Sequence, residues 1–413
     1  MRILSGPAAA ARVRKMAARR SQYARVEPVV RRIIADVRKH GDRAVRKYSE
    51  RWDGLSQQEP LRISEEEITA AWKSASAELR NSLRAAAANI HRFCEWQKPA
   101  QWMRTRQGIS VGQIVRPLDS VGCYVPGGRY PLVSTLLMTV IPAQVAGVQN
   151  IRVVSPKPRI EVLAAAGMLG AREVYRIGGA QAIAALAYGT RSVPRVDKIV
   201  GPGNLYVTAA KKLVAFDCAI DFLAGPTEVV IVSDKGNSEF IAADLVAQAE
   251  HDTETFAAFI TTNHKLAQQV GRSANKLSVG NAVAQESLRR NGVILVSSSR
   301  RQSFQWANEL ASEHLTVDAS DVPLVRNAGS VFVGNYSPQA AGDYASGPNH
   351  VLPTGAAARF RGGLSVLDFV KVISIQRLSR HGLKRIAPVV ESLASAEGLR
   401  AHAHSIRTRV AHA

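Results

Sequence analysis

Gln248 and His251 stand three residues apart in the stretch 245–255, and their side-chain types could do chemistry. At 3.6 residues per turn this spacing puts both side chains on one face of a helix, and the apolar residues before them predict that the helix packs in the core. A polar pair that includes a histidine could supply half of a metal site. The same pair is typical of a partly solvated surface turn, so the pattern alone leaves both interpretations open.

Acidic and histidine side chains also occur together in three later stretches. These pairs are Glu313 with His314, Asp343 with His350, and Glu397 with His402. An adjacent acid and imidazole can divide acid and base work, because both titrate near neutral pH once their surroundings tune them. Asp343 and His350 lie in a loop rich in Gly, Pro and Asn, and such loops often serve a site. Taken singly, the other two pairs are also typical of exposed helix ends.

Four of these side chains together form a nitrogen and oxygen donor set. They are Gln248, His251, Asp343 and His402. Two imidazoles, one carboxylate and one amide oxygen suit zinc or a similar divalent ion, with room for a substrate. No thiolate is required. The three cysteines, Cys94, Cys123 and Cys218, are widely separated, so we expect reduced, buried thiols and a cytoplasmic location.

The net charge of +21 over 413 residues lies mainly at the two ends of the chain. Residues 1–51 hold 15 Lys and Arg against 4 Asp and Glu, and residues 359–413 hold 10 against 3. A basic nucleic-acid-binding protein is therefore one hypothesis, but no zinc finger or aromatic-interleaved basic motif supports it. No apolar run is long enough to span a membrane, and the basic N-terminus lacks the pattern of a secretory signal.

The elements that must position these residues alternate between strands and helices. Apolar strands are expected at 121–125, 151–156, 173–178, 196–200, 228–234, 256–262, 293–298 and 330–334, and a hairpin at 102–116. Glycine turns follow three of the strands, at 127–128, 178–179 and 201–203. Turns of this kind bind anionic ligands at helix N-termini. The turns at 178–179 and 201–203, each at the end of an expected parallel strand, make a dinucleotide site the favoured interpretation. We expect an α/β fold with two Rossmann-like parallel-sheet domains and helical N- and C-terminal extensions.

Several long motifs, in order, resemble the histidinol dehydrogenase family. They are VGCYVPGGRYPLVST (121–135), GGAQAIAALAYGT (178–190), VDKIVGPGNLYVT (196–208), AGPTEV (224–229), LVAQAEHD (245–252), SEHL (312–315) and AGDYASGPNHVLPTG (341–355). The resemblance runs from about residue 28 to 410. It implies oxidation of L-histidinol through L-histidinal to L-histidine in two NAD-dependent steps, by an intertwined homodimer with one Zn²⁺ in each subunit.

The resemblance also implies roles for individual residues. Zinc would be bound by Gln248, His251, Asp343 and, from the other subunit, His402. His314 would be the base for the alcohol proton, and Glu313 would activate water on the aldehyde, which leaves Cys123 without a required catalytic role. The implied substrate contacts are Thr227, His350, Glu397, His314 and the four zinc ligands. The implied NAD contacts are Tyr124, Gln181 and Asn204.

The expected domains divide the chain into four parts. Residues 1–27 would form a helical arm, and residues 28–118 with 229–365 a first α/β domain that carries the zinc and catalytic residues. Residues 119–228 would form the domain with the NAD contacts, and residues 366–413 a helical segment that reaches the partner.

One alternative concerns the substrate. Arg359 and Arg361 follow the loop at 342–353, here called the substrate loop. They would suit an anionic alcohol in a related zinc- and NAD-dependent dehydrogenase. Thr227 and Pro348 also depart from residues that the family often has, Ser and Thr respectively.

Overall fold

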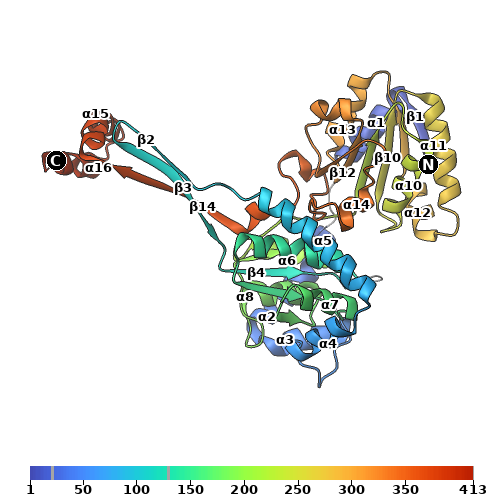
Figure 1. Ribbon diagram of the computed structural model, residues 1–413, viewed down its shortest axis with the longest axis horizontal. Helices are drawn as coiled ribbons and strands as arrows, with labels where there is room; N and C mark the ends of the chain where they lie inside the picture. The colour runs from blue at the N-terminus through green and yellow to red at the C-terminus, as the bar shows by residue number, and fades with distance from the viewer. Residues whose placement is uncertain (20–22, 128–130, 413) are drawn as a thin grey trace.

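The computed structural model describes residues 1–19, 23–127 and 131–412, which form two α/β units and an extended arm (Figure 1). The larger sheet has six parallel strands in the order β1-β11-β10-β9-β12-β13. These are β1 (Arg2–Ser5), β9 (Glu228–Val232), β10 (Phe256–Thr261), β11 (Val293–Val296), β12 (His314–Val317) and β13 (Ser330–Val333). The inner strands are buried on both faces, so they read as continuous apolar runs.

Helices cover both faces of this sheet. One face packs against α1 (Gly6–Ala17) and α13 (Arg300–Leu310). The other packs against α10 (Ser238–Ala249), α11 (His264–Leu277) and α12 (Ala282–Arg290). Short helical segments complete the unit, namely η2 (Ala319–Leu324), α14 (Gln339–Tyr344) and η3 (Ala357–Arg359).

The N-terminal segment differs from the expected helical arm. Residues Arg2–Ser5 pair in parallel with β11 and form an edge of the six-stranded sheet, and α1 buries Ala9, Val13 and Met16 beneath it. Only four residues make the strand, which is too short for an alternation to stand out in the sequence. The first 19 residues therefore belong to the same unit as residues 228–333.

The second sheet has five parallel strands in the order β6-β5-β4-β7-β8. These are β4 (Ser120–Tyr124), β5 (Asn150–Val154), β6 (Glu173–Tyr175), β7 (Lys198–Val200) and β8 (Ala219–Ile220). One face packs against α4 (Glu65–Ser74), α5 (Ala77–Trp96), α6 (Val133–Ala146) and α7 (Ile160–Met168). The other packs against α2 (Glu27–His40), α3 (Asp42–Trp52), α8 (Gly179–Tyr188) and α9 (Leu205–Val214), with η1 (Tyr23–Arg25) beside them.

Helices α2 to α5 thus lie on the 119–228 sheet, whereas we expected residues 28–118 to join residues 229–365. In α2, Val30, Ile33, Ile34 and Val37 bury a stripe that packs with α8 and α9. Such a stripe predicts a buried helix face but carries no information about which of two sheets receives it.

The arm consists of a three-stranded antiparallel sheet and a helical hairpin. Its strands are β2 (Trp102–Arg106), β3 (Ile109–Pro117) and β14 (Val370–Leu378), in the order β14-β3-β2, so the expected hairpin at 102–116 is confirmed. After η4 (Val366–Phe369) and β14, α15 (Arg380–Ala396) and α16 (Arg400–Ala411) pack on each other far from both α/β units (Figure 1). The expected helical segment 366–413 is therefore part strand, since its β-branched residues extend along β3.

Candidate active site

Helices α10 and α14 bring Gln248 and Asp343 together. Gln248 lies in the last turn of α10 and is 2% exposed, and its Nε2 donates to Asp343 Oδ2 on α14 at 3.2 Å. Its Oε1 is buried and has no hydrogen-bond partner among the described residues. Because α10 ends at Ala249, exposed His251 lies just beyond the helix and not on its face as expected.

The pKa of the Asp343 carboxyl is shifted by burial and by three histidines. Burial alone would raise the pKa of Asp343, but the charges of His314, His350 and His251 bring this pKa below its ordinary value. The His350 ring is fixed by its Nδ1, which donates to the Asp343 carbonyl at 2.7 Å, and its Nε2 lies 3.4 Å from Thr135 Oγ1. Burial lowers the pKa of the His350 imidazole, and the negative charge of Asp343 opposes this shift only in part.

His314 and Glu313 form a buried acid–imidazole pair at the start of β12. We had expected this pair at the end of a helix; α13 instead ends at Leu310, and His314 is the first residue of the strand. Its Nδ1 donates to the Glu228 carbonyl at 3.2 Å and lies 3.7 Å from Glu313 Oε2. Its Nε2 lies 3.5 Å from Asp343 Oδ1 and has no hydrogen-bond partner among the described residues.

The two side chains are tuned by each other and by burial. Burial raises the pKa of the Glu313 carboxyl well above its ordinary value. Burial would lower the pKa of His314, but the negative charges of Glu313 and Asp343 outweigh it and raise this pKa. A perturbed acid and base in contact, beside a cavity of about 380 Å³ lined by His314, Asp343 and His350, is the arrangement that acid–base chemistry requires.

Glu228 is a residue that the sequence reasoning missed. Its backbone N–H donates to Glu313 Oε2 at 2.9 Å, and its carbonyl accepts from His314. Its carboxylate accepts from Arg19 Nε at 2.6 Å and from the Gly355 N–H at 2.8 Å. Glu228 directly follows Thr227 in the AGPTEV motif, and that position was the only available signal.

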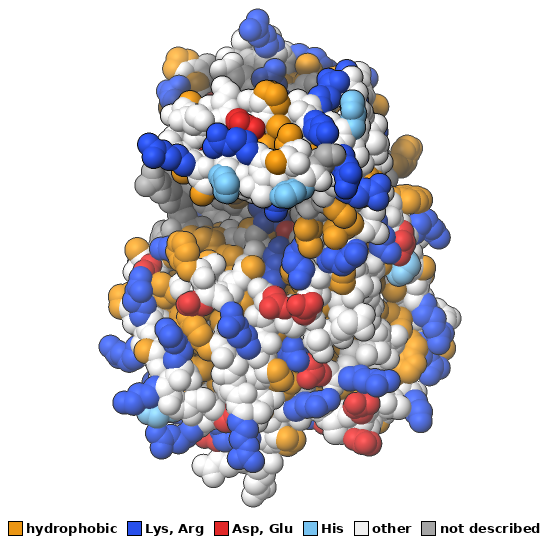
Figure 2. Space-filling model, turned by 90° about the vertical axis from the view of Figure 1, so that its left-hand side faces the viewer, with side chains coloured by type: hydrophobic (Ala, Val, Ile, Leu, Met, Phe, Trp, Pro, Cys, Tyr) orange, Lys and Arg blue, Asp and Glu red, His pale blue; other side chains and the backbone are white. Residues whose placement is uncertain are grey.

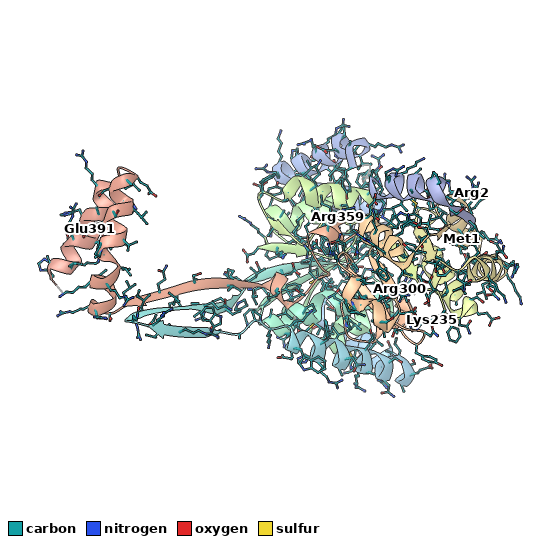
Figure 3. The ribbon with its side chains drawn as sticks, turned by 90° about the horizontal axis from the view of Figure 1, so that it is seen from above. Met1, Arg2, Lys235, Arg300, Arg359 and Glu391 are labelled. Carbon is teal, nitrogen blue, oxygen red and sulfur yellow. The ribbon has the colours of Figure 1, made fainter. Side chains whose placement is uncertain are left out.

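Two expected site residues lie elsewhere in the same chain. Glu397 and His402 are exposed on the helical hairpin of the arm. Figure 3 shows Glu391, on the same hairpin, far from Arg300 and Lys235 on the larger α/β unit. Within the part of the chain that the structure describes, no cluster of three His, Cys, Asp or Glu side chains could hold a metal ion.

The two arginines after the substrate loop are engaged in holding the fold. Arg359 donates to the Glu309 carbonyl. Arg361 donates to the Asp221 carbonyl, lies 3.2 Å from Asp368 Oδ1 and stacks over Phe222 at 4.3 Å. These contacts give no support to an anionic-substrate role.

The three expected NAD contacts line one cavity of about 630 Å³ in the second unit. Tyr124 Oη accepts from the Gly179 N–H at 3.1 Å, and Gln181 Nε2 donates to Asp53 Oδ2 at 3.1 Å. Asn204 caps α9 by accepting from Tyr206 N at 3.0 Å. The residues come from the ends of β4, β6 and β7, so the cavity lies at the carboxyl edge of a parallel sheet.

Glycine turns shape this edge. Gly201 has a φ of 110°, and a Cβ there would lie 2.2 Å from the Tyr124 carbonyl oxygen, so only glycine fits. Gly128, expected in the first turn, lies outside the described residues. Asp53, which accepts from Gln181 and from the Gly178 N–H at 3.0 Å, was not predicted, because it comes from a distant helix end.

A titratable pair in one α/β unit and a cavity at strand ends in the other are the arrangement of a two-domain α/β enzyme. Comparisons with known proteins identify the family. The family model described as histidinol dehydrogenase matches residues 16–410, so the match begins earlier than the expected residue 28.

Relatives and a solved structure agree. Histidinol dehydrogenase from Methanothermobacter thermautotrophicus is 46% identical over 92% of each chain, and that from Methanosarcina barkeri is 44% identical over 97% of this chain and 95% of the relative. The crystal structure of histidinol dehydrogenase from Elizabethkingia anophelis has a TM-score of 0.94 and 35% identity, covering 99% of this chain and 98% of that chain. The chain belongs to the histidinol dehydrogenase family and is an oxidoreductase.

Proposed function

We propose that this enzyme oxidises L-histidinol to L-histidine through L-histidinal, in two NAD⁺-dependent steps, with one Zn²⁺ in each active site. The observation that carries the proposal is the buried Glu313–His314 pair. His314 Nε2 lies 3.5 Å from Asp343 Oδ1 and has no hydrogen-bond partner among the described residues. Membership of the family supplies the substrate, since the relatives are named for it.

The residues around Asp343 fit a divalent cation. The buried Gln248 Oε1 accepts no hydrogen bond from any described residue. An amide oxygen, an imidazole and a carboxylate are ligands that zinc accepts. Gln248, Asp343 and His251 would hold the ion, which supplies a positive centre that orients the substrate imidazole and amine.

His314 acts in the alcohol step. Its Nε2 takes the proton of the substrate hydroxyl while the carbon gives up its hydride to NAD⁺, and the Glu228 carbonyl holds the ring through Nδ1. Tyr124, Gln181 and Asn204 line the cavity in which we place NAD⁺.

Glu313 acts in the aldehyde step. It takes a proton from water as the water oxygen adds to the aldehyde carbon, and the hydrate then loses a second hydride to a second NAD⁺. Burial raises the pKa of this carboxyl toward neutral pH, which suits a base that must also return a proton. His350 and Thr227 would contact the substrate.

We further propose that the site is completed by a second chain. The hairpin of α15 and α16, which carries Glu397 and His402, lies far from α14, which carries Asp343 (Figure 1). The arm also exposes large apolar side chains, including Trp102, Val372, Val389 and Leu393, and Figure 2, which faces this end, shows hydrophobic patches between Lys and Arg. Such patches are covered in a dimer.

None of the described helices is long and apolar enough to cross a membrane. The described cysteines are free and buried, in keeping with a reducing cytoplasm, where we propose the reaction occurs.

The test is stoichiometric. Purified protein loaded with Zn²⁺ should yield two NADH for each L-histidine formed from L-histidinol, and a chelator should abolish this yield. Folded, zinc-loaded protein that forms no NADH would refute the proposal. A charged alcohol oxidised faster than histidinol would transfer the assignment to another substrate.

A further inference from the structure

The order of the second sheet places the loop after β5 at a recognisable position. The order β6-β5-β4-β7-β8 corresponds to 3-2-1-4-5 in the nucleotide-binding half of a doubly wound fold. The chain reverses direction across the sheet between β4 and β7, and Tyr124 and Asn204 of the cavity follow these two strands. In such folds an acid near the second strand binds the ribose 2′-hydroxyl of NAD⁺, whereas a basic side chain there accommodates the 2′-phosphate of NADP⁺.

The loop after the second strand of this sheet is basic. It runs Ser155-Pro156-Lys157-Pro158-Arg159, contains no acid and lines the cavity along its whole length. Among the described residues, neither Lys157 nor Arg159 has a carboxylate within ion-pair distance.

Asp53, the acidic residue among the described residues that line the cavity, already accepts hydrogen bonds from other groups of the chain. Asp53 is buried and accepts from the Gly178 N–H and from Gln181 Nε2. The charge of Lys157 acts on Asp53 without forming an ion pair. The wall of the cavity after β5 therefore has two cations outside ion pairs, and no described lining residue offers a carboxylate without a hydrogen-bond partner.

The loop is held rigidly. Pro156 is packed so closely that a Cβ at Gly127 would lie 2.2 Å from its carbonyl oxygen, and one at Gly178 would lie 2.6 Å from its ring. Lys157 has a φ of 45°, in the left-handed region that residues other than glycine seldom adopt. Its side chain lies over Gly54, where a Cβ would come within 2.4 Å of Nζ. Arg159 precedes α7, whose N-terminal N–H groups add positive potential.

We infer that the loop 155–159 binds the 2′-phosphate of NADP⁺ through Lys157 and Arg159, so that this enzyme uses NADP⁺ as well as NAD⁺. The inference rests on the proposed function only in placing the dinucleotide in this cavity. The hydride, the proton and the product are the same with either cofactor.

Calorimetric titration of the zinc-loaded enzyme with NAD⁺ and NADP⁺ separately, without histidinol, tests the inference. We expect the two Kd values to lie within about tenfold of each other. The double variant Lys157→Ala/Arg159→Ala should raise the ratio of the NADP⁺ Kd to the NAD⁺ Kd at least about tenfold, because charge-assisted contacts to phosphate are lost. Arg172→Ala removes one positive charge from the same unit outside the cavity and should leave the ratio unchanged.

Two results would overturn the inference while leaving the proposed function intact. One is binding of NAD⁺ with no binding of NADP⁺. The other is a Kd ratio that the double variant does not change, which would mean that the two cations contact a phosphate common to both cofactors. Failure of both nucleotides to bind would instead refute the cofactor assignment itself, and the inference with it.

Discussion

The proposed chemistry depends on a few side chains whose pKa values are shifted by close neighbours. His314 is buried between two carboxylates, Glu313 and Asp343, while its Nδ1 is held by a backbone carbonyl. This arrangement leaves only Nε2 free to exchange a proton with a substrate.

Replacement of His314 tests its role as the base. We predict that His314→Asn lowers kcat for histidinol oxidation by about 10²–10⁴-fold with little change in KM, because a positioned base is lost while the zinc-binding residues remain. Steady-state kinetics with NAD⁺ measures both constants. His264→Asn makes the same exchange at the exposed start of α11 and should retain activity. A His314→Asn enzyme with near-normal kcat would exclude this residue as the base.

Asp244, one turn before Gln248, makes stability depend on pH. Burial raises its pKa from 3.8 to about 6, so between these values the folded protein binds more protons than the unfolded chain, and stability falls as pH rises. We predict that Asp244→Asn raises the free energy of unfolding at pH 8 by about 1 kcal/mol, since the side chain is partly accessible to water. The gain should shrink toward pH 5. Urea unfolding of the metal-free proteins measures it, and a gain that is equal at both pH values would point to packing instead of charge.

Most of the residues that meet at the candidate site could be chosen from the sequence, but the residues that hold them in place could not. Gln248, Asp343, Glu313 and His314 were chosen for their side-chain types, and the structure brings these four together. Glu228 escaped notice because its contacts come from Arg19, Glu313 and Gly355, far away in the chain. No local pattern records such contacts.

At the scale of elements, a buried ion pair secures the turn between β7 and α9. Lys211 Nζ pairs with Asp221 Oδ1 and donates to the Gly201 carbonyl at 2.9 Å, and Asp221 Oδ2 accepts from the Gly201 N–H at 2.8 Å. Both side chains are almost fully buried. The pair therefore fixes the turn that leads to Asn204, which lines the cavity of the second unit.

We predict that Lys211→Met destabilises the protein by about 3–5 kcal/mol, because it leaves a buried charge on Asp221 without a partner. The double variant Lys211→Met/Asp221→Asn should recover part of this loss, since the charge is removed and an acceptor is kept. Urea unfolding at constant zinc concentration gives the values. A loss below about 1 kcal/mol in the single variant would contradict the prediction.

The positions of the helices and strands were predicted better than the sheets against which the helices pack. The alternation of strands and helices from residue 120 onward followed from apolar runs and glycine turns. The sheet against which α2 to α5 pack could not be predicted, because an apolar stripe such as that of Val30, Ile33 and Val37 fits either sheet. The strand β14 is largely exposed, so it lacked the buried alternation that marks a strand.

At the scale of the whole molecule, the arm separates His402 from the other three proposed metal ligands. One chain brings Gln248 and Asp343 together near His251, while His402 lies on a hairpin that contacts neither α/β unit (Figure 1). A second chain that lends its arm would resolve this separation.

The exposed apolar side chains of α15 provide a test of association. Val389 and Leu393 lie four residues apart and are 60% and 61% exposed, so they form one face. We predict that Val389→Asp/Leu393→Asp converts the dimer to monomers and abolishes activity, because charges would be buried in the interface. Light scattering after gel filtration measures the mass. Val279→Asp, at an exposed apolar site on the larger unit, should leave the mass of the assembly unchanged.

The central claim is that each active site combines residues of two chains, and mixed dimers test it most directly. His314→Asn and His402→Ala, each inactive alone, are co-expressed with different tags, and heterodimers are purified through both tags. If His402 serves the other chain, one site of each heterodimer is intact, and we predict about half of wild-type activity per dimer. Heterodimers as inactive as either parent would contradict the claim.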